Sequence, residues 1–160
     1  MTFRDAVKRV LEHEGGHVHD PDDRGGETNF GISRRAYPEE DIRGMTAERA
    51  AAIYERDYWP VARDLPIAVR GTVFDMAVNA GRTRAVRLLQ DALNQLGHDV
   101  AVDGVIGPET LRAVRASDPL ALLHVYTTRR VRYYARLAGR RGRMRKFLLG
   151  WVNRALGWVE

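Results

Sequence analysis

The sequence contains no cysteine, and this absence limits the chemistry open to the folded chain. Without cysteine there is no disulfide, no thiolate nucleophile and no thiolate ligand for a metal. Long apolar runs are missing too. No stretch approaches the roughly 20 residues that cross a bilayer, so we expect no stable membrane insertion. The fold must therefore rest on side-chain packing alone.

Lysine is almost absent from a strongly basic chain. Only Lys8 and Lys146 accompany the arginines, yet 26 basic residues against 21 acidic ones give a formal charge of +5. Such a surface favours anionic partners, and the arginines at 140–145 permit nucleic-acid binding. No nucleic-acid-binding motif is present, however, and the acidic residues at 20–23 would repel phosphate. We therefore expect no nucleic-acid partner, and a basic face that is solvated or holds another anionic surface.

Hydrophobic spacing predicts a mainly helical chain of one-domain size. The first predicted helix begins at a Thr2 cap and ends near Glu14, because Gly15-Gly16 is a strong helix stop. The turn-rich stretch from Gly15 to Ile32 can form at most a short hairpin. Further helices are predicted to begin at Thr46, Pro66, Thr83, Pro108 and Asp118, and a last one to carry the apolar residues from Phe147 to Trp158.

The segment that follows the first predicted helix concentrates the acidic residues of interest. Glycoside hydrolysis commonly needs one protonated and one ionised carboxyl group. Glu14 stands at a helix C-terminus, where partial negative charge raises a carboxyl pKa if the group is also shielded from water. Asp20, Asp22 and Asp23 lie in a wetter, turn-rich stretch and should stay ionised. Glu14 and Asp23 are therefore the preferred acid and second carboxylate.

Simpler explanations exist for the same aspartates. Aspartate and proline favour turns for local reasons, which accounts for Asp20 and Asp22 as readily as sugar binding does. A calcium loop is disfavoured because Arg24 stands where an oxygen ligand belongs. Downstream, Thr28 or Asn29 could hold a water molecule by hydrogen bonding. The choice among the aspartates and between these two polar residues stays open.

The same residues also match the sequence pattern of a zinc protease. His13, Glu14 and His17 match the zinc-protease pattern H-E-x-x-H, which needs both histidines on one helical face. Two glycines occupy the middle of the pattern, and each costs about 1 kcal/mol relative to alanine in a helix. They also stand where a helix stop is predicted. We therefore expect no metal site and no organic cofactor.

The whole segment resembles the glycoside hydrolase family 108 muramidases, phage-type lysozymes that also occur in specialised secretion systems. The family glutamate corresponds to Glu14. The later part of the chain resembles the family's predicted peptidoglycan-binding half. The resemblance is carried in order by Glu14-Gly15-Gly16, Asp20-Pro21-Asp22-Asp23, Gly25-Gly26-Glu27-Thr28, Phe30-Gly31-Ile32-Ser33, Tyr58-Trp59, Phe74 to Gly81, Asp103 to Leu111, and Phe147-Leu148 with Gly150-Trp151.

The resemblance implies a lysozyme-like helical fold with a small hairpin at the catalytic cleft. It implies hydrolysis between N-acetylmuramic acid and N-acetylglucosamine, with Glu14 as the catalytic acid. Beside it we expect Asp23 as the second carboxylate and Thr28, or else Asn29, as the residue that orients water. We expect a catalytic part at 1–84 and a peptidoglycan-binding helical part at 85–160, packed as one monomeric unit. The start of the sequence lacks a signal peptide. We therefore expect cytoplasmic synthesis and action on the cell wall after holin-type or secretion-linked release.

Four further residues could line a sugar groove. Tyr58 and Trp59 offer aromatic faces and Asn79 an amide, while Asp75 would either bond across the cleft or brace a helix end. Core packing is the competing explanation for the aromatic pair and for Asn79. A protein that binds the wall without cutting it is the main functional alternative, and it would leave Glu14 idle.

Overall fold

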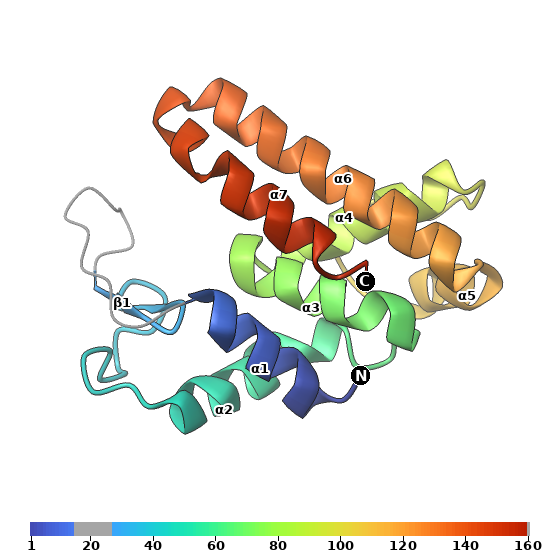
Figure 1. Cartoon of the computed structure of the whole chain (residues 1–160). Coiled ribbons are helices and arrows are strands. Elements are labelled where there is room, and N and C mark those ends of the chain that lie inside the picture. Colours follow the sequence, from blue (N-terminus) through green and yellow to red (C-terminus); the bar gives the residue numbers. More distant parts are fainter. Residues whose placement is uncertain (15–26, 160) are drawn as a thin grey trace. The chain divides into compact units, whose positions relative to one another are not determined.

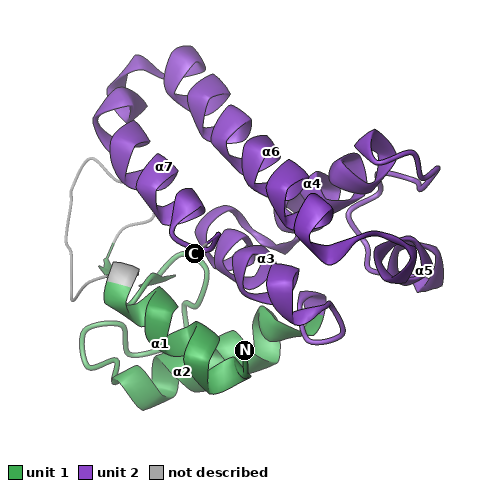
Figure 2. Cartoon of the chain, turned by 45° about the vertical axis from the view of Figure 1, so that its right-hand side comes forward, with its two compact units in different colours: residues 1–60 green, residues 61–160 purple. Residues whose placement is uncertain are grey.

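The computed structural model describes residues 1–14 and 27–159, with the side chains of residues 1–12 and 27–159. The chain divides into two compact units, residues 1–60 and residues 61–160, each of which is treated by itself (Figure 2). None of the described helices combines the length and the apolar character that crossing a bilayer requires.

Unit 1 contains two helices and a short hairpin. Thr2 caps the first helix as predicted: the backbone amide of Asp5 donates to Thr2 Oγ1 over 3.3 Å, and Thr2 N donates to Asp5 Oδ2 over 2.8 Å. Such reciprocal bonds satisfy amides that a helix start leaves open. The elements are α1 (Phe3–Glu14), β1 (Thr28–Asn29), β2 (Ile32–Ser33) and α2 (Ala47–Asp57), followed by a short 3₁₀ turn, η1 (Trp59–Val61).

The predicted hairpin is present between residues 28 and 33. Asn29 pairs with Ile32, and Thr28 pairs with Ser33. Phe30 and Gly31 make the turn with φ values of 47° and 71°, both left-handed. Two consecutive left-handed residues give the turn whose twist matches antiparallel strands. The Tyr54 hydroxyl of α2 donates to the Phe30 carbonyl and so holds this unusual turn against the helix.

The regular elements of unit 2 are all helices within its described residues, and loops connect them. Pro108 begins its helix as predicted, and Asp118 caps the next helix by accepting from Ala121 N over 2.7 Å. The mainly α fold with a small hairpin is thus confirmed. The elements are α3 (Ile67–Ala80), α4 (Arg82–Gln95), α5 (Pro108–Ala116), α6 (Pro119–Arg140), the 3₁₀ helix η2 (Gly142–Phe147) and α7 (Leu148–Leu156) (Figure 1).

Three helix starts predicted in unit 2 were wrong. Pro66 is the cap of α3 and not its first residue, which is Ile67. Thr83 does not cap α4, because the helix already begins at Arg82 and Gly81 is the single residue between α3 and α4. Gly81 reaches a φ of 89°, which glycine adopts without the strain of a side chain. The last helix begins at Leu148, one residue later than predicted, because Phe147 ends the 3₁₀ helix that connects α6 to α7.

Candidate active site

Glu14 is the last residue of α1, the position that the glycine stop predicted. Ala6, Val7 and Val10 of α1 are buried, and Phe3 meets the ring of Trp59 edge-on at 5.3 Å between centroids. This packing fixes the direction of the helix and hence the place where it ends. The side chain of Glu14, with Asp20, Asp22 and Asp23, lies outside the described residues.

The β1–β2 hairpin lies beside the C-terminal end of α1 in both ribbon views (Figures 1 and 2). Its two polar residues behave differently. Asn29 is buried, and its amide nitrogen donates to the Ile42 carbonyl over 3.1 Å and approaches that of Met45 at 3.5 Å. Thr28 is half-buried and, because neighbouring strand residues alternate, faces the other side. Asn29 therefore anchors the segment after the hairpin, while Thr28 is the more accessible of the two.

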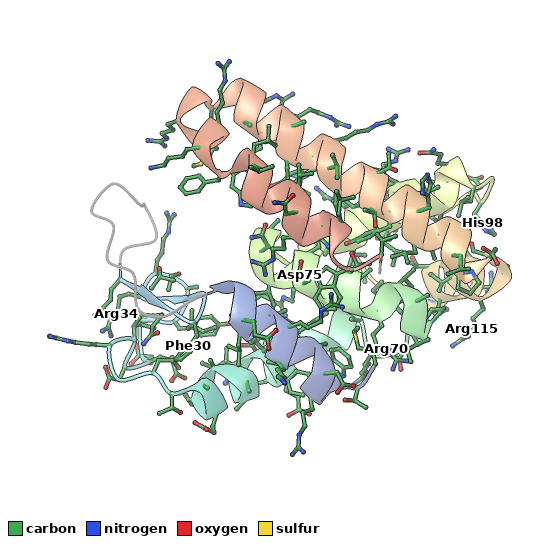
Figure 3. All side chains as sticks on the ribbon, in the orientation of Figure 1. Phe30, Arg34, Arg70, Asp75, His98 and Arg115 are labelled. Atoms are coloured by element: carbon green, nitrogen blue, oxygen red, sulfur yellow. The ribbon has the colours of Figure 1, made fainter. Side chains whose placement is uncertain are left out.

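Two ion pairs, linked by a hydrogen bond to a backbone carbonyl, support the base of the hairpin. Arg34 reaches Glu27 Oε2 at 3.1 Å and donates to the Glu40 carbonyl over 2.8 Å (Figure 3). Two guanidinium nitrogens of Arg49, on α2, donate hydrogen bonds to the Glu40 carboxylate over 3.0 and 2.6 Å. The hydrogen bonds from Arg49 lower the pKa of Glu40. Sequence reasoning gave these residues no structural role, although the basic pair Arg34-Arg35 between Glu27 and Glu39-Glu40 was the available signal.

Tyr58 and Trp59 sit where α2 ends, and both are half-buried. Tyr58 meets the ring of Tyr54 edge-on at 5.6 Å, so each member of the pair has a packing contact within unit 1. Tyr37 donates its hydroxyl to Asp57 Oδ2 over 2.9 Å. Burial, followed by its hydrogen bond with Tyr58, raises the pKa of Tyr37, which keeps that hydroxyl protonated. Tyr58 and Trp59 thus combine packing contacts with partly exposed aromatic surface.

Asp75 lies on α3 in the interior of unit 2, fully buried (Figure 3). Arg130 of α6 donates to its Oδ2 over 2.5 Å, and Arg154 of α7 donates to its Oδ1 over 2.8 Å. Arg130 also donates to Thr72 Oγ1 over 2.6 Å. Burial alone would lower the pKa of Arg130, but the Asp75 carboxylate raises it overall. Asp75 thus joins three helices from the interior of α3, whereas the brace expected from the sequence was of a helix end.

Asn79 lies one turn after Asp75 on α3. Its Oδ1 accepts from the Tyr134 hydroxyl over 2.8 Å, and Tyr134 stacks on Trp151 at 5.3 Å between centroids. Asn79 is half-buried. Its carbonyl oxygen is therefore held by α6, which positions its amide without removing the residue from the surface.

The turn from Asp103 to Pro108 is fixed by a buried glutamine on α4. Gln90 Nε2 lies within hydrogen-bond distance of Asp103 Oδ1 at 2.7 Å and the Val105 carbonyl at 3.0 Å, while Gln90 Oε1 accepts from Gly104 N over 2.9 Å. The bond from Val105 N, then that from Gln90, lowers the pKa of Asp103. A cavity of about 420 Å³ adjoins the turn and α5. Sequence reasoning gave Gln90 no role, although a polar residue between apolar Leu89 and Leu93 was the clue.

No group of three or more His, Asp or Glu side chains that could hold a metal occurs in the part of the chain that the structure describes. The two histidines of the H-E-x-x-H pattern, His13 and His17, have side chains outside that part.

Comparison with known proteins decides the family. Residues 7–81 match the model of glycosyl hydrolase 108, and residues 84–156 match that of a predicted peptidoglycan domain. A solved structure of Brucella abortus SagA has 31% sequence identity and a TM-score of 0.77, covering 99% of this chain and 95% of that one. The chain belongs to glycoside hydrolase family 108. No curated protein matches it.

As a family 108 member, the chain is a glycoside hydrolase with a lysozyme-like fold, and its function concerns peptidoglycan. The first family match contains the end of α1, the hairpin, and Tyr58 with Trp59. It also contains Asp75 and Asn79, which belong to unit 2. The two matches meet between residues 81 and 84, whereas the compact units meet at 60 and 61. The division at 84 and 85 stays a prediction.

Proposed function

We propose that the protein is an N-acetylmuramidase that uses Glu14 as its general acid. The observation that carries the proposal is the end of α1 at Glu14, inside the region that matches glycosyl hydrolase 108. A carboxyl group at a helix C-terminus faces partial negative charge, which favours its protonated form. A protonated carboxyl group near neutral pH is what a glycosidase acid needs.

The proposed reaction begins with proton transfer from Glu14 to the oxygen that joins N-acetylmuramic acid to N-acetylglucosamine. The bond from that oxygen to the muramic acid C1 breaks, and its electron pair stays on the oxygen. Positive charge develops on the sugar that loses this bond, and a second carboxylate stabilises it. We propose Asp23 for this role. Water then adds to C1, and its proton passes to a carboxylate, which completes hydrolysis without a metal or an organic cofactor.

We propose Thr28 rather than Asn29 as the residue that orients the water. The Asn29 amide nitrogen is engaged by the Ile42 carbonyl, and its side chain is buried. Thr28 is half-buried at the first position of β1. The strand β1 lies beside the end of α1 (Figure 1). Asn29 then contributes by holding the hairpin in place.

The sugar-binding roles of Asp20, Asp22, Tyr58, Trp59 and Asn79 remain proposals. The half-buried rings of Tyr58 and Trp59 suit stacking on a sugar face. Asn79 suits a hydrogen bond to an N-acetyl group, because Tyr134 fixes its amide. The buried carboxylate of Asp75 is saturated by arginines, so we assign it to the core of unit 2.

The proposed setting is the bacterial cell wall. We propose that the enzyme acts as a monomer and reaches the wall after holin-type or secretion-linked release, in a phage or a secretion system. The region matching a predicted peptidoglycan domain would keep the enzyme on its substrate.

The test is digestion of purified sacculi by the wild type, Glu14→Gln and Glu12→Gln. General acid catalysis contributes about 10²- to 10⁴-fold, so Glu14→Gln should lose that much activity without losing stability. Glu12 is an exposed residue of the same helix, and its variant should be fully active. Undiminished release of fragments by Glu14→Gln would refute the assignment. Activity that EDTA abolishes, with new amino groups instead of reducing ends, would support the zinc peptidase.

A further inference from the structure

The C-terminal part of the chain has a one-sided charge. Residues 119–159 contain ten basic residues and not one acidic residue. Two of the ten, Arg130 and Arg154, are neutralised in part by the buried Asp75. A third, Arg129, forms a long ion pair with Asp91, with 3.9 Å between a guanidinium nitrogen and Oδ2. The remaining seven are partly or fully exposed and form no ion pair within the described residues.

Five of these seven cations gather at one place, the connection between α6 and α7. We call this connection the basic tip; it consists of Arg140, Arg141, Arg143, Arg145 and Lys146, all exposed. The tip lies at the end of the paired helices farthest from α5 in both ribbon views (Figures 1 and 2). The 3₁₀ helix η2 keeps the connection short, so the five charges stay close together.

Large apolar side chains stand next to the cations. Phe147, which directly follows the tip in sequence, is 44% exposed, and Leu149, two residues later, is 71% exposed. Lys146 Nζ lies 4.9 Å from the centre of the Phe147 ring, so a cation and an apolar group share one surface. Stacking of Tyr134 on Trp151 holds α6 and α7 together behind them. The exposed apolar groups therefore project from a packed pair of helices.

We infer that the basic tip docks on an anionic phospholipid surface. Arginines and lysine attract the lipid phosphates, and Phe147 and Leu149 gain by entering the boundary between headgroups and acyl chains. A soluble polyanion would use the charges but would have no use for the exposed apolar side chains. The contact is peripheral and reversible, and it is independent of the proposed glycosidase chemistry.

The test is co-sedimentation of the full chain with vesicles of phosphatidylglycerol and phosphatidylcholine in equal parts, and with phosphatidylcholine alone. The tip variant carries Arg141→Gln, Arg143→Gln and Arg145→Gln. The control carries Arg43→Gln, Arg63→Gln and Arg115→Gln, which remove the same net charge from exposed positions elsewhere. Both variants should keep the wild-type Tm, because all six side chains are exposed.

The wild type should bind the anionic vesicles and not the neutral ones. The tip variant should bind about 100-fold more weakly, since each basic residue near an anionic surface contributes about 1 kcal/mol. The control should stay close to wild type. Leu149→Ser should weaken binding about tenfold, through loss of apolar contact alone.

Two results would overturn the inference. Equal losses in the tip variant and the control would show that only the total charge matters. Binding of inorganic polyphosphate as tight as binding of vesicles, with no effect of Leu149→Ser, would assign the tip to a soluble polyanion.

Discussion

The two units of the chain carry opposite charge, which the total conceals. Residues 1–60 contain nine basic and thirteen acidic residues, a formal charge of −4, whereas residues 61–160 contain seventeen and eight, a charge of +9. The proposed acid chemistry lies in the acidic unit, where neighbouring negative charge disfavours ionisation of a further carboxyl group. The basic unit suits attachment to anionic surfaces. The pI of about 10.0 therefore results from the excess of basic residues in unit 2.

The units also differ in how they satisfy buried polar groups. In unit 1, Asn29 bonds to backbone carbonyls of a nearby segment. In unit 2, Asp75 bonds to arginines 55 and 79 positions away. Local bonds position a small hairpin, while the long-range pairs join α3, α6 and α7. Substitutions of catalytic residues in unit 1 should therefore lower activity with little effect on stability. Substitutions in the core of unit 2 should lower stability strongly.

The largest expected effect after that of Glu14 concerns the second carboxylate. Asp23→Asn should lower the rate of sacculus digestion about 10²- to 10⁴-fold, as for loss of a group that acts in the transition state. Asp20→Asn and Asp22→Asn should lower it much less, because we assign them to sugar binding. The rates are compared at saturating substrate. A loss from Asp20→Asn or Asp22→Asn that exceeds the loss from Asp23→Asn would move the role to that residue.

The buried ion pairs give the largest expected effect on stability. Asp75→Asn leaves Arg130 and Arg154 buried without their counter-ion, which should lower the free energy of unfolding by about 3–5 kcal/mol. Asp91→Asn is the matched control, because the Asp91 side chain is 41% exposed and its pair with Arg129 is long. Its effect should stay below about 1 kcal/mol. Urea unfolding measures both, and equal losses would contradict the role of the buried pairs.

The hairpin allows activity and stability to be separated at adjacent residues. Asn29→Ala leaves a buried carbonyl without its partner and should destabilise by about 1–3 kcal/mol. Thr28→Val keeps the shape of the side chain and removes its hydroxyl, so it should lower activity with little change in stability. Thermal unfolding and sacculus digestion of both variants decide the matter. Full activity in Thr28→Val would remove that residue from the mechanism.

The smallest expected effect concerns the turn that Gln90 holds. Gly104 has a φ of 86°, and a Cβ there would lie 2.7 Å from Thr83 Cγ2. Gly104→Ala should therefore destabilise by about 1 kcal/mol or more. Gly107→Ala is the control, because a Cβ there meets nothing within 4 Å. Equal unfolding midpoints for the two variants would show that the turn tolerates a side chain at Gly104.

Local signals in the sequence predicted much of the fold. Thr2, Thr46, Pro108 and Asp118 mark helix starts in the structure because caps depend on a few neighbouring residues. The prediction that Thr83 caps a helix was wrong because Gly81 alone separates α3 from α4, which leaves no room for a separate cap. The short hairpin expected in the turn-rich stretch from Gly15 to Ile32 is present at the end of that stretch, across residues 28–33.

The contacts that fix the site and the core could not be predicted in this way. Arg130 and Arg154 lie in runs that otherwise read as apolar helix faces, and their shared partner is far away in sequence. Gln90 likewise gains its role only when the turn at residues 103–108 folds onto α4. Pairing across such distances depends on tertiary packing. A charge within an apolar helical face signals a buried partner but does not identify it.

The most direct test of the central claim is the chemical identity of the sugar end that the enzyme creates. Sacculi are digested to completion, and the fragments are reduced with borohydride and analysed by mass spectrometry. Our account predicts that N-acetylmuramic acid carries every new reducing end, and that the Glu14→Gln digest lacks these fragments. New reducing ends on N-acetylglucosamine, or new amino termini without new reducing ends, would contradict it.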